Sequence, residues 1–395
     1  MGARAAGLAQ LCLAALLTLA LPTQAAELRV AVPAGARPET VFDWNGQACE
    51  GWDVPDAPAR AWRGVDGTVH LLAAHTTARA LTGPSLDRVA PDCKVVFESG
   101  RNDDPGRYDD RGWLAAPYTT DGRVVYALVH NEYHGHERRA LCPVGGYAAC
   151  WWNSVTLAVS TDGGARFRAA GYVAGIPYRF RGDLGHRAGL FGPSNIVEKD
   201  GWYYATAFAE ETGAQKRGVC LMRTRDLAAP GSWRGWDGRG FTVRFLDPYA
   251  EPGENPAGHV CAPLPAGRLP FTVTSLVRHA PTGLYVAAMA GRRTETPGVP
   301  PVSGVWVSSS ADLLSWSPPR LAWAAPLMTD PDRCGAAETV YYPSILDPDS
   351  PSRNFEDTDD TAFLYLTRLR MKGCAPTTQR DLIRVPIRLD PVADR

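Results

Sequence analysis

The chain has 395 residues and a balanced charge, with 41 basic and 42 acidic side chains. This balance excludes the broad basic surface that nucleic-acid binding needs. No long run of like charge indicates a membrane surface or a polyanion as partner. The composition therefore predicts a globular protein with no nucleic-acid and no membrane partner.

The first 26 residues have the three parts of a secretory signal peptide. Arg4 supplies the positive start, residues 8–21 form an apolar run, and residues 23–26 are small enough for a cleavage site. The apolar run is too short for a transmembrane helix. We therefore expect an exported protein, secreted or periplasmic. Because strand patterns continue to the end without a linker, residues 27–395 are predicted to form one domain.

A strand–turn–strand pattern recurs about five times after the leader. Apolar residues alternate with polar ones on both sides of a turn, and the turn is Asp-Gly in the first three copies, which is a strong hairpin signal. The turn glycines are Gly67, Gly122, Gly201 and Gly283, and the fifth turn is a longer loop near residues 357–360. Self-similarity at this period indicates a radial repeat of β-hairpins.

The second half of several units ends in a short acidic turn closed by an aromatic residue. Examples are Ser160-Thr-Asp162 with Phe167, and Ser310-Ala-Asp312 with Trp316. An Asp side chain accepts hydrogen bonds from turn amides, so these carboxylates are predicted to be structural. Two hairpins make one four-stranded blade. The predicted fold is all-β: a five-bladed β-propeller of four-stranded antiparallel blades.

Eight cysteines remain after the leader, an even number that suggests disulfides in an exported protein. Sequence alone does not fix how they pair. Our hypothesis pairs nearest neighbours, and the expected pairs are Cys49–Cys93, Cys142–Cys150, Cys220–Cys261 and Cys334–Cys374.

The strongest catalytic candidate is Glu132, which follows the apolar run at residues 124–130 in a cluster of polar and aromatic side chains. Propeller ligands bind where the inner strands converge. A glutamate at that place can have a raised pKa and act as a general acid. The alternative is a solvated turn glutamate.

Asp56 and Asp53 form a second candidate cluster, held rigid by the prolines at 55 and 58. Either carboxylate can act as the base or nucleophile opposite Glu132, and the alternative is capping of a turn. Arg60 is expected to bind a substrate carboxylate or to orient Asp56 through a bidentate contact. A structural ion pair is the other interpretation of Arg60.

Further side chains are substrate-binding candidates because they begin or end the strands expected to converge. They are His75, His130, Asn131, Tyr133, His134, Asn195, Glu210 and Tyr342. The spacing of His130, His134 and His136 suggests a metal, but these residues form no recognised ligand motif. We predict no metal and no cofactor.

The repeats, the Ser-x-Asp-Leu turns and the leading Asp together resemble the five-bladed arabinanase–xylosidase–fructosidase group of glycoside hydrolases. The resemblance implies a blade-one carboxylate as base or nucleophile, and Asp56 or Asp53 matches it by position. The group's other two carboxylates are absent from the expected strands, which read Pro117-Tyr118 and Pro193-Ser194. Their role would then pass to Glu132 or Glu210.

The full acidic turn from Ser160 to Phe167, together with Arg60, is similar to the sialidase superfamily, which implies an arginine cluster for a carboxylated sugar. We predict a secreted glycoside hydrolase that acts on a poly- or oligosaccharide through a carboxylate acid/base mechanism. The alternatives are a sialidase-like hydrolase, a non-catalytic carbohydrate-binding propeller and an interaction protein without a sugar ligand. The oligomeric state stays open.

Overall fold

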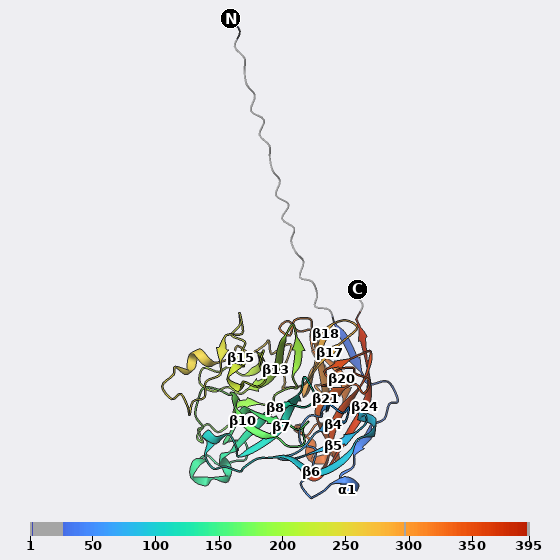
Figure 1. Cartoon of the computed structure of the whole chain (residues 1–395), viewed down its shortest axis with the longest axis horizontal. Coiled ribbons are helices and arrows are strands. Elements are labelled where there is room, and N and C mark those ends of the chain that lie inside the picture. The colour runs from blue at the N-terminus through green and yellow to red at the C-terminus, as the bar shows by residue number, and fades with distance from the viewer. Residues whose placement is uncertain (1, 3–26, 296–297, 393–395) are drawn as a thin grey trace.

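The computed structural model describes residue 2, residues 27–295 and residues 298–392, so the predicted signal peptide lies outside the described residues (Figure 1). Nearly all regular structure is β. In the described ranges one α-helix occurs, α1 (Trp44–Gln47), and no helix there is long and apolar enough to span a membrane. The 3-10 turns are η1 (Leu86–Arg88), η2 (Pro105–Arg107), η3 (Gly135–Glu137), η4 (Arg139–Leu141), η5 (Pro230–Ser232), η6 (Pro256–His259) and η7 (Arg333–Gly335).

The first sheet contains consecutive antiparallel strands, in the order β3-β4-β5-β6. These strands are β3 (Arg60–Arg63), β4 (Val69–Leu72), β5 (Thr77–Gly83) and β6 (Ala90–Glu98). The sheet includes the first predicted hairpin, because Arg60 pairs with Leu72 and Arg63 with Val69. Its buried core includes Leu71, which is inaccessible to solvent.

The largest sheet joins two antiparallel groups through one short parallel pairing of β9 with β11. The first group contains β7 (Arg111–Tyr118), β8 (Val125–His134), β9 (Trp151–Ser160) and β10 (Arg168–Ala174). The second contains β11 (Ala188–Phe191), β12 (Val197–Lys199), β13 (Trp202–Ala209), β14 (Gly218–Thr224), β15 (Arg234–Gly235) and β16 (Val243–Arg244). The joining pairs are Ala188 with Trp152 and Gly189 with Asn153.

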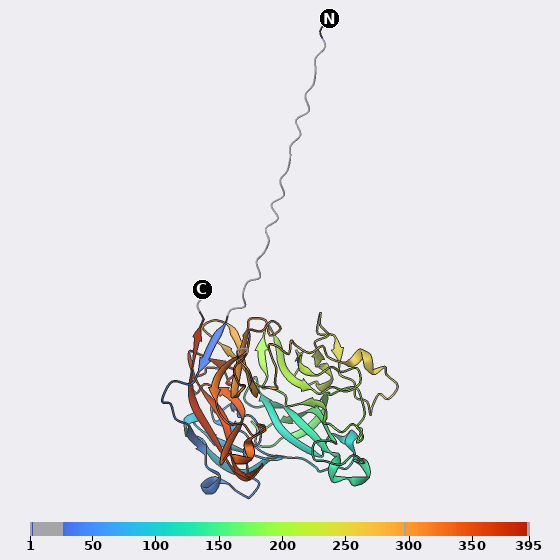
Figure 2. The same ribbon diagram turned by 180° about the vertical axis from the view of Figure 1, so that it is seen from behind.

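Two further sheets complete the chain. The third contains β17 (Val273–His279), β18 (Leu284–Arg293), β19 (Val302–Ser310), β20 (Arg320–Ala324) and β22 (Asp357–Thr358). The fourth contains β21 (Glu338–Leu346), β23 (Thr361–Lys372), β24 (Ala375–Pro391), β1 (Leu28–Ala31) and β2 (Glu39–Phe42). Strand β1 pairs with β24, so the first and last strands lie side by side, as the blue and red strands show from both sides (Figures 1 and 2).

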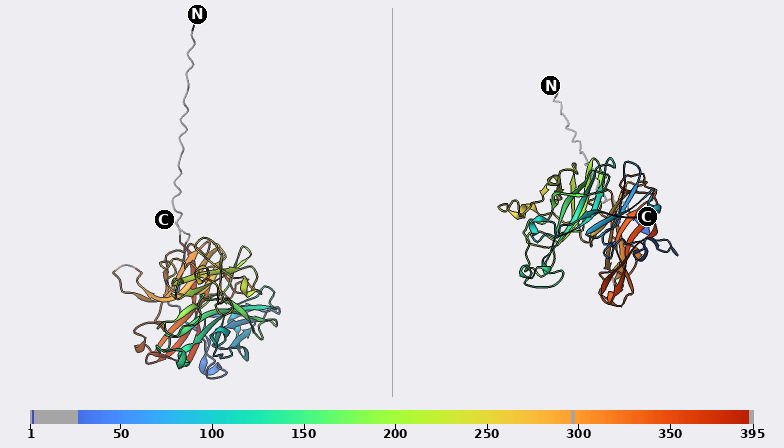
Figure 3. Two further views of the ribbon diagram at one scale, coloured as in Figure 1. Left: turned by 90° about the vertical axis from the view of Figure 1, so that its left-hand side faces the viewer. Right: turned by 60° about the horizontal axis from the view of Figure 1, so that its bottom comes forward.

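The predicted all-β class is confirmed. The sheets follow one another around the molecule in chain order, and two further views show how strongly they curl (Figure 3). Each of the five sequence repeats forms one pair of antiparallel strands, and the two strands of each pair belong to the same group. Because two groups share hydrogen bonds in the ten-stranded sheet, the number of five blades stays a prediction.

The predicted turn glycines have the left-handed backbone that glycine tolerates best, with φ values of 84° at Gly67 and 76° at Gly122. The Asp200–Gly201 turn has the conformation expected of a two-residue hairpin turn, because both residues have positive φ, 53° and 73°. In the first two turns, however, Asp66 and Asp121 do not share this conformation. Instead, Asp66 accepts a hydrogen bond from the amide of Thr68. In these turns the carboxylate caps the loop, and glycine alone supplies the positive φ.

The acidic turns have the predicted structural role. The Asp162 carboxylate accepts hydrogen bonds from the Ser160 hydroxyl at 2.5 Å and the Arg166 amide at 3.0 Å. Phe167 then packs edge-on against Trp62, which belongs to the preceding sheet, with ring centroids 6.2 Å apart. The turn therefore places an aromatic ring between neighbouring groups of strands.

All four predicted disulfides are confirmed. The described cysteines pair as nearest neighbours, with sequence separations of 44, 8, 41 and 40 residues. Cys334–Cys374 ties η7 to the turn between β23 and β24. This crosslink matters for the site because residues on both sides of it line the main cavity.

Candidate active site

A cavity of about 880 Å³ is lined by residues from all five groups of strands. Asp56 and His75 line it from the first group, Trp113 and Glu132 from the second, and Tyr342 from the last. The size suits an oligosaccharide segment or another ligand of a few rings. Two candidate carboxylates from different groups of strands therefore line one space.

Strand β8 places Glu132 in the cavity because side chains alternate between the two faces of a strand. His130, Glu132 and His134 line the cavity, whereas Asn131 and Tyr133 do not. Cross-strand pairing with β7 sets Arg111 opposite Glu132. The three cavity-lining residues of β8 are buried, and Glu132 is 7% exposed.

The hydrogen bonds around Glu132 fix the protonation of its neighbour His134. Arg111 contacts the Nδ1 atom of His134, and a guanidinium can only donate, so Nδ1 must be the acceptor. The Nε2 atom of His134 therefore carries the proton and donates to Oε2 of Glu132 at 2.7 Å. The other oxygen of Glu132 lies 3.9 Å from Nε2 of His130 and accepts no hydrogen bond from it.

The expected raised pKa of Glu132 is wrong. Burial by itself raises the pKa of this carboxyl, but the hydrogen bond from His134 and electrostatic interactions with His130, His134 and Arg187 outweigh burial and lower it overall. The structure therefore favours an ionised Glu132, which is suited to act as a base or nucleophile rather than as an acid.

Asp56 is held by four neighbouring groups. One carboxylate oxygen contacts the Arg380 guanidinium and accepts from the Tyr342 hydroxyl at 3.4 Å. The other accepts from Nε1 of Trp113 at 3.3 Å and lies 3.6 Å from Nε2 of His75. These contacts come from several strands and loops, and they fix the carboxylate at the cavity wall.

Asp53 lies outside the cavity, although the sequence analysis assigns it the same candidate role as Asp56. Its carboxylate accepts a hydrogen bond from the amide of Cys49 at 2.9 Å and lines a separate, small pocket under Phe42 and Leu382. The two aspartates differ because they lie on either side of Pro55 and contact different parts of the protein: Asp56 lines the main cavity, and Asp53 contacts the Cys49 loop. We assign Asp53 to the loop that carries the Cys49–Cys93 disulfide.

His75 stands beside Asp56 between two tryptophans. Its ring centroid is 5.7 Å from that of Trp52 and 5.7 Å from that of Trp113. Burial lowers the pKa of this imidazole; Asp56 opposes the shift, and the charges of Arg380 and nearby arginines add to it. His75 is therefore neutral at neutral pH and gains a proton only in acid.

Arg60 does not line the cavity, contrary to its predicted substrate-binding role. Its guanidinium donates to the carbonyls of Ala59, Ala115 and Thr274 and to the Ser344 hydroxyl, at 2.6–3.0 Å. These bonds join β3 to β7, β17 and β21, the first strands of four groups. Arg60 is a central structural crosslink, and burial lowers its pKa to about 9.

Four other substrate-binding candidates also have structural partners outside the cavity. Asn131 donates to Thr156, and Tyr133 donates to the carbonyl of Asp103. Asn195 exchanges two hydrogen bonds with the backbone of Leu276, and Glu210 is ion-paired with Arg187 and Arg217. Position at a strand end did not distinguish these residues, because half of such side chains face away from the cavity.

Several cavity residues were not selected from the sequence. Among them are the arginines Arg101, Arg111, Arg333 and Arg380 and the aromatic residues Trp52, Trp113, Tyr147 and Trp151. The alternation of side chains along a strand is the signal that could have identified Arg111 and Trp113, because both lie on the face of β7 that lines the cavity. The remaining residues come from loops or from distant strands and carry no local signal.

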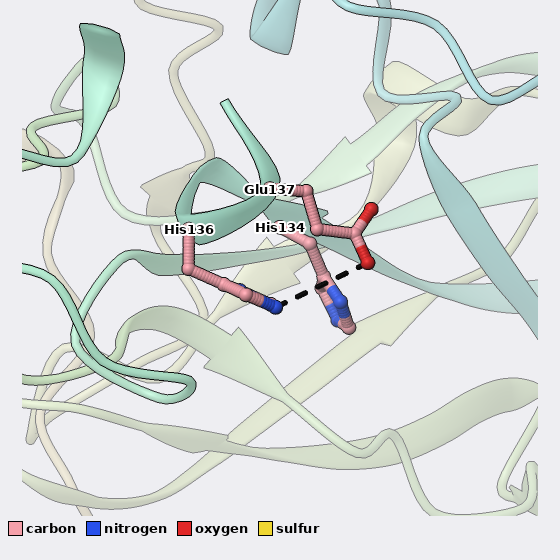
Figure 4. A group of neighbouring side chains, drawn as sticks. All are labelled: His134, His136 and Glu137. Atoms are coloured by element: carbon pink, nitrogen blue, oxygen red, sulfur yellow. Dashed lines mark ion pairs between the residues drawn. The ribbon is translucent and has the colours of Figure 1, made fainter. Parts of the chain in front are cut away.

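His134, His136 and Glu137 form a group whose ligand atoms lie within 4.8 Å of one another, and Figure 4 shows His136 and Glu137 as an ion pair beside His134. This geometry resembles a metal site. However, Arg111 donates to both Glu137 carboxylate oxygens, at 2.6 and 2.8 Å, and also contacts His134. The Arg111 guanidinium, which is always charged, therefore already binds two of the three candidate ligands, and we assign no metal to this group.

No protein-family model and no curated protein matches the chain. Among solved structures, the chain is similar to the α-L-arabinanase of Cellvibrio cellulosa in complex with arabinohexaose, with 14% identity over 84% of this chain and 91% of the arabinanase, and a TM-score of 0.47. It is also similar to a glycosyl hydrolase from Bacteroides ovatus, with 12% identity, coverage of 92% and 96%, and a TM-score of 0.47.

Proposed function

We propose that this protein is a glycoside hydrolase that cleaves its sugar substrate in the cavity between Asp56 and Glu132. The observation that carries the proposal is the pair of carboxylates from different groups of strands lining one cavity. Most glycosidases need two such groups on opposite sides of the scissile bond. Burial is the largest cause of the raised pKa values of Tyr147 and Tyr342, and the charges of Glu132 and Asp56 raise both values further. The two carboxylates therefore act on the same tyrosines.

Glu132 takes the base or nucleophile role in this proposal. Its lowered pKa keeps it ionised, and His134 occupies only one of its two oxygens. The second oxygen is available to a water molecule or to the anomeric carbon. This assignment reverses the role expected from the sequence, in which Glu132 was the acid.

The proton for the leaving group comes from the Asp56–His75 pair. Nε2 of His75 lies 3.6 Å from the carboxylate, and both residues line the cavity. Protonated His75 is stabilised by the adjacent Asp56, so the pair holds a proton in acidic solution. A positioned acid of this kind contributes roughly 10²–10⁴-fold to the rate.

Aromatic rings at the cavity provide the sugar-binding surface. Trp52 is 60% exposed and Tyr147 is 65% exposed, and both line the cavity with Trp113 and Trp151. Large aromatic side chains exposed at a cavity rim mark a binding site, because leaving them in water is unfavourable. Their flat faces can stack on sugar rings.

The test compares three amide variants on a panel of poly- and oligosaccharides, with released reducing ends as the measure. Glu132→Gln and Asp56→Asn should retain the fold and lose roughly 10²–10⁴-fold in turnover. Asp53→Asn is the matched control, since the same change three residues earlier lies outside the cavity and should leave turnover unchanged. Full activity of Glu132→Gln would overturn the proposal.

A carbohydrate-binding protein without hydrolytic activity is the second candidate. One observation favours it: both carboxylates already have cationic or hydrogen-bonding partners, namely Arg380 for Asp56 and His134 for Glu132. Isothermal calorimetry separates the two functions, because a lectin would bind a sugar that it never cleaves. In either case we propose that residues 27–395 act as one exported domain, and the four disulfides support export.

A further inference from the structure

Four arginines from four separate segments line the cavity. Arg101 lies in the loop after β6, Arg111 in β7, Arg333 in η7 and Arg380 in β24. Two of them have carboxylate partners: Arg111 pairs with Glu137, and Arg380 pairs with Asp56. Their charge is therefore largely compensated within the protein.

The other two arginines have no carboxylate partner in the described part of the chain. Arg333 is positioned by the backbone, because it donates to the carbonyls of Cys374 and Asp330, each at 3.1 Å. The Cys334–Cys374 disulfide holds this segment in place. Arg101 is exposed and lines the cavity together with Asp56 and His75, and its charge contributes to the lowered pKa of the His75 imidazole.

A third uncompensated cation lies beneath the cavity. The partners of Arg60 are three carbonyls and one hydroxyl, all neutral. Two of those carbonyls belong to Ala115 and Thr274, which themselves line the cavity. A buried charge usually has a counter-ion, and Arg60 has no carboxylate partner among the described residues, whereas two of its acceptor residues line the cavity.

Building on the proposed hydrolase, we propose that the cavity binds an acidic sugar and that Arg101 and Arg333 are its anion-binding residues. A hexuronate fits best, because a planar guanidinium binds a planar carboxylate through two parallel hydrogen bonds. The aromatic rings then bind the apolar faces of the sugar, and the arginines select its charge. A sulfate ester offers the same charge with different geometry.

The experiment measures binding with the Glu132→Gln variant, so that cleavage does not confuse the result. The probes are oligogalacturonides, glucuronate-containing oligosaccharides and the same oligosaccharides after chemical reduction of their carboxyl groups. At least one acidic probe should bind 10-fold or more tightly than its reduced counterpart. The preference should weaken as salt rises, since the anion-binding residues are partly exposed. If a sulfated oligosaccharide bound more tightly than every uronate probe, the assignment of a hexuronate would be overturned.

Arg101→Gln and Arg333→Gln identify the anion-binding residues. One or both should reduce affinity for the acidic probe about 10-fold and leave affinity for the reduced probe unchanged. Arg29→Gln, an exposed position in β1 outside the cavity, controls for the loss of one charge. Equal binding of acidic and reduced probes, or unaltered preference in both variants, overturns the inference even when the wild-type protein hydrolyses neutral glycans.

Discussion

At the scale of single residues, the site depends on a chain of contacts from Glu137 through Arg111 and His134 to Glu132. Arg111 binds Glu137 with one guanidinium nitrogen and contacts His134 with another. This contact fixes the His134 tautomer, which in turn fixes the hydrogen bond to Glu132. Glu137 and Arg111 are therefore positioning residues that act on Glu132 through His134.

The pH dependence of turnover should be bell-shaped and confined to acid. Activity needs an ionised Glu132, whose pKa lies below its ordinary value, so the acidic limb falls only in strong acid. Activity also needs a protonated His75, whose pKa is lowered by burial, so the other limb is lost as the pH rises to about 6.5, the unperturbed value for histidine. Initial rates from pH 3 to 9 measure both limbs.

His75→Gln provides the check on this assignment. The variant should lose most of its activity at the wild-type optimum, together with the limb on the alkaline side. A wild-type optimum above pH 8 would show that His75 does not supply the proton.

At the scale of elements, the acidic turns stabilise the molecule without contributing to catalysis. Asp162→Ala removes two hydrogen bonds, from the Ser160 hydroxyl and the Arg166 amide. We expect a loss of about 1–2 kcal/mol in the free energy of unfolding, since each such bond contributes about 1 kcal/mol. Urea denaturation measures this loss, and turnover per folded molecule should stay at the wild-type value.

Glu211→Ala, an exposed carboxylate outside these turns, is the control and should leave the denaturation midpoint close to wild type. A fully stable Asp162→Ala protein without activity would contradict the structural role.

Strand β8 shows how an element decides which residues of a polar run can function. The five residues from His130 to His134 all look functional in the sequence, but the alternation of a β-strand divides them into two sets. His130, Glu132 and His134 line the cavity, and the other two pack elsewhere. The pairing of β8 with β7 then brings Arg111 to Glu132.

At the scale of the whole molecule, the ends of the chain are joined in one sheet. Leu28 pairs with Pro391 and Ala31 with Arg388, so the first strand completes the sheet formed by the last. The disulfides act at shorter range, within single groups of strands or between neighbouring ones. Closure of the fold and covalent crosslinking are thus separate sources of stability.

The disulfides should differ in their contribution to stability. Cys142–Cys150 closes a loop of 8 residues and Cys334–Cys374 one of 40 residues. In the chain-entropy account, the longer loop gives about 1 kcal/mol more stabilisation. Thermal unfolding of the two Cys→Ser double variants should show the smaller drop in Tm for the pair at 142 and 150. The reverse order would mean that local strain or residual structure outweighs loop entropy.

The sequence by itself determined the features that depend on local order. Glycine at position 67 and the acidic turn at Asp162 specify their own backbone, so the β-hairpins and turns were predictable. The even cysteine count indicated disulfides, and the separate hypothesis of nearest-neighbour pairing is confirmed. The sequence also selected Glu132 and Asp56 as candidates, because each belongs to a distinctive local run, and both line the cavity. The sequence suggested a site for a carboxylated sugar only through Arg60, which lies outside the cavity, and it did not point to Arg101 or Arg333.

Only the tertiary structure decided which of these residues meet. Arg380 reaches Asp56 across 324 positions of sequence, a contact that no local pattern encodes. The hydrogen bond from His134 and the surrounding electrostatic interactions, which exist only in the folded chain, outweigh burial and lower the pKa of Glu132. For this reason we propose that Glu132 is the base or nucleophile. The arginines of the cavity are scattered along the chain, and they converge because the sheets curl around one centre. Electrostatic potential depends on distances in space, and those distances arise only when the strands pack.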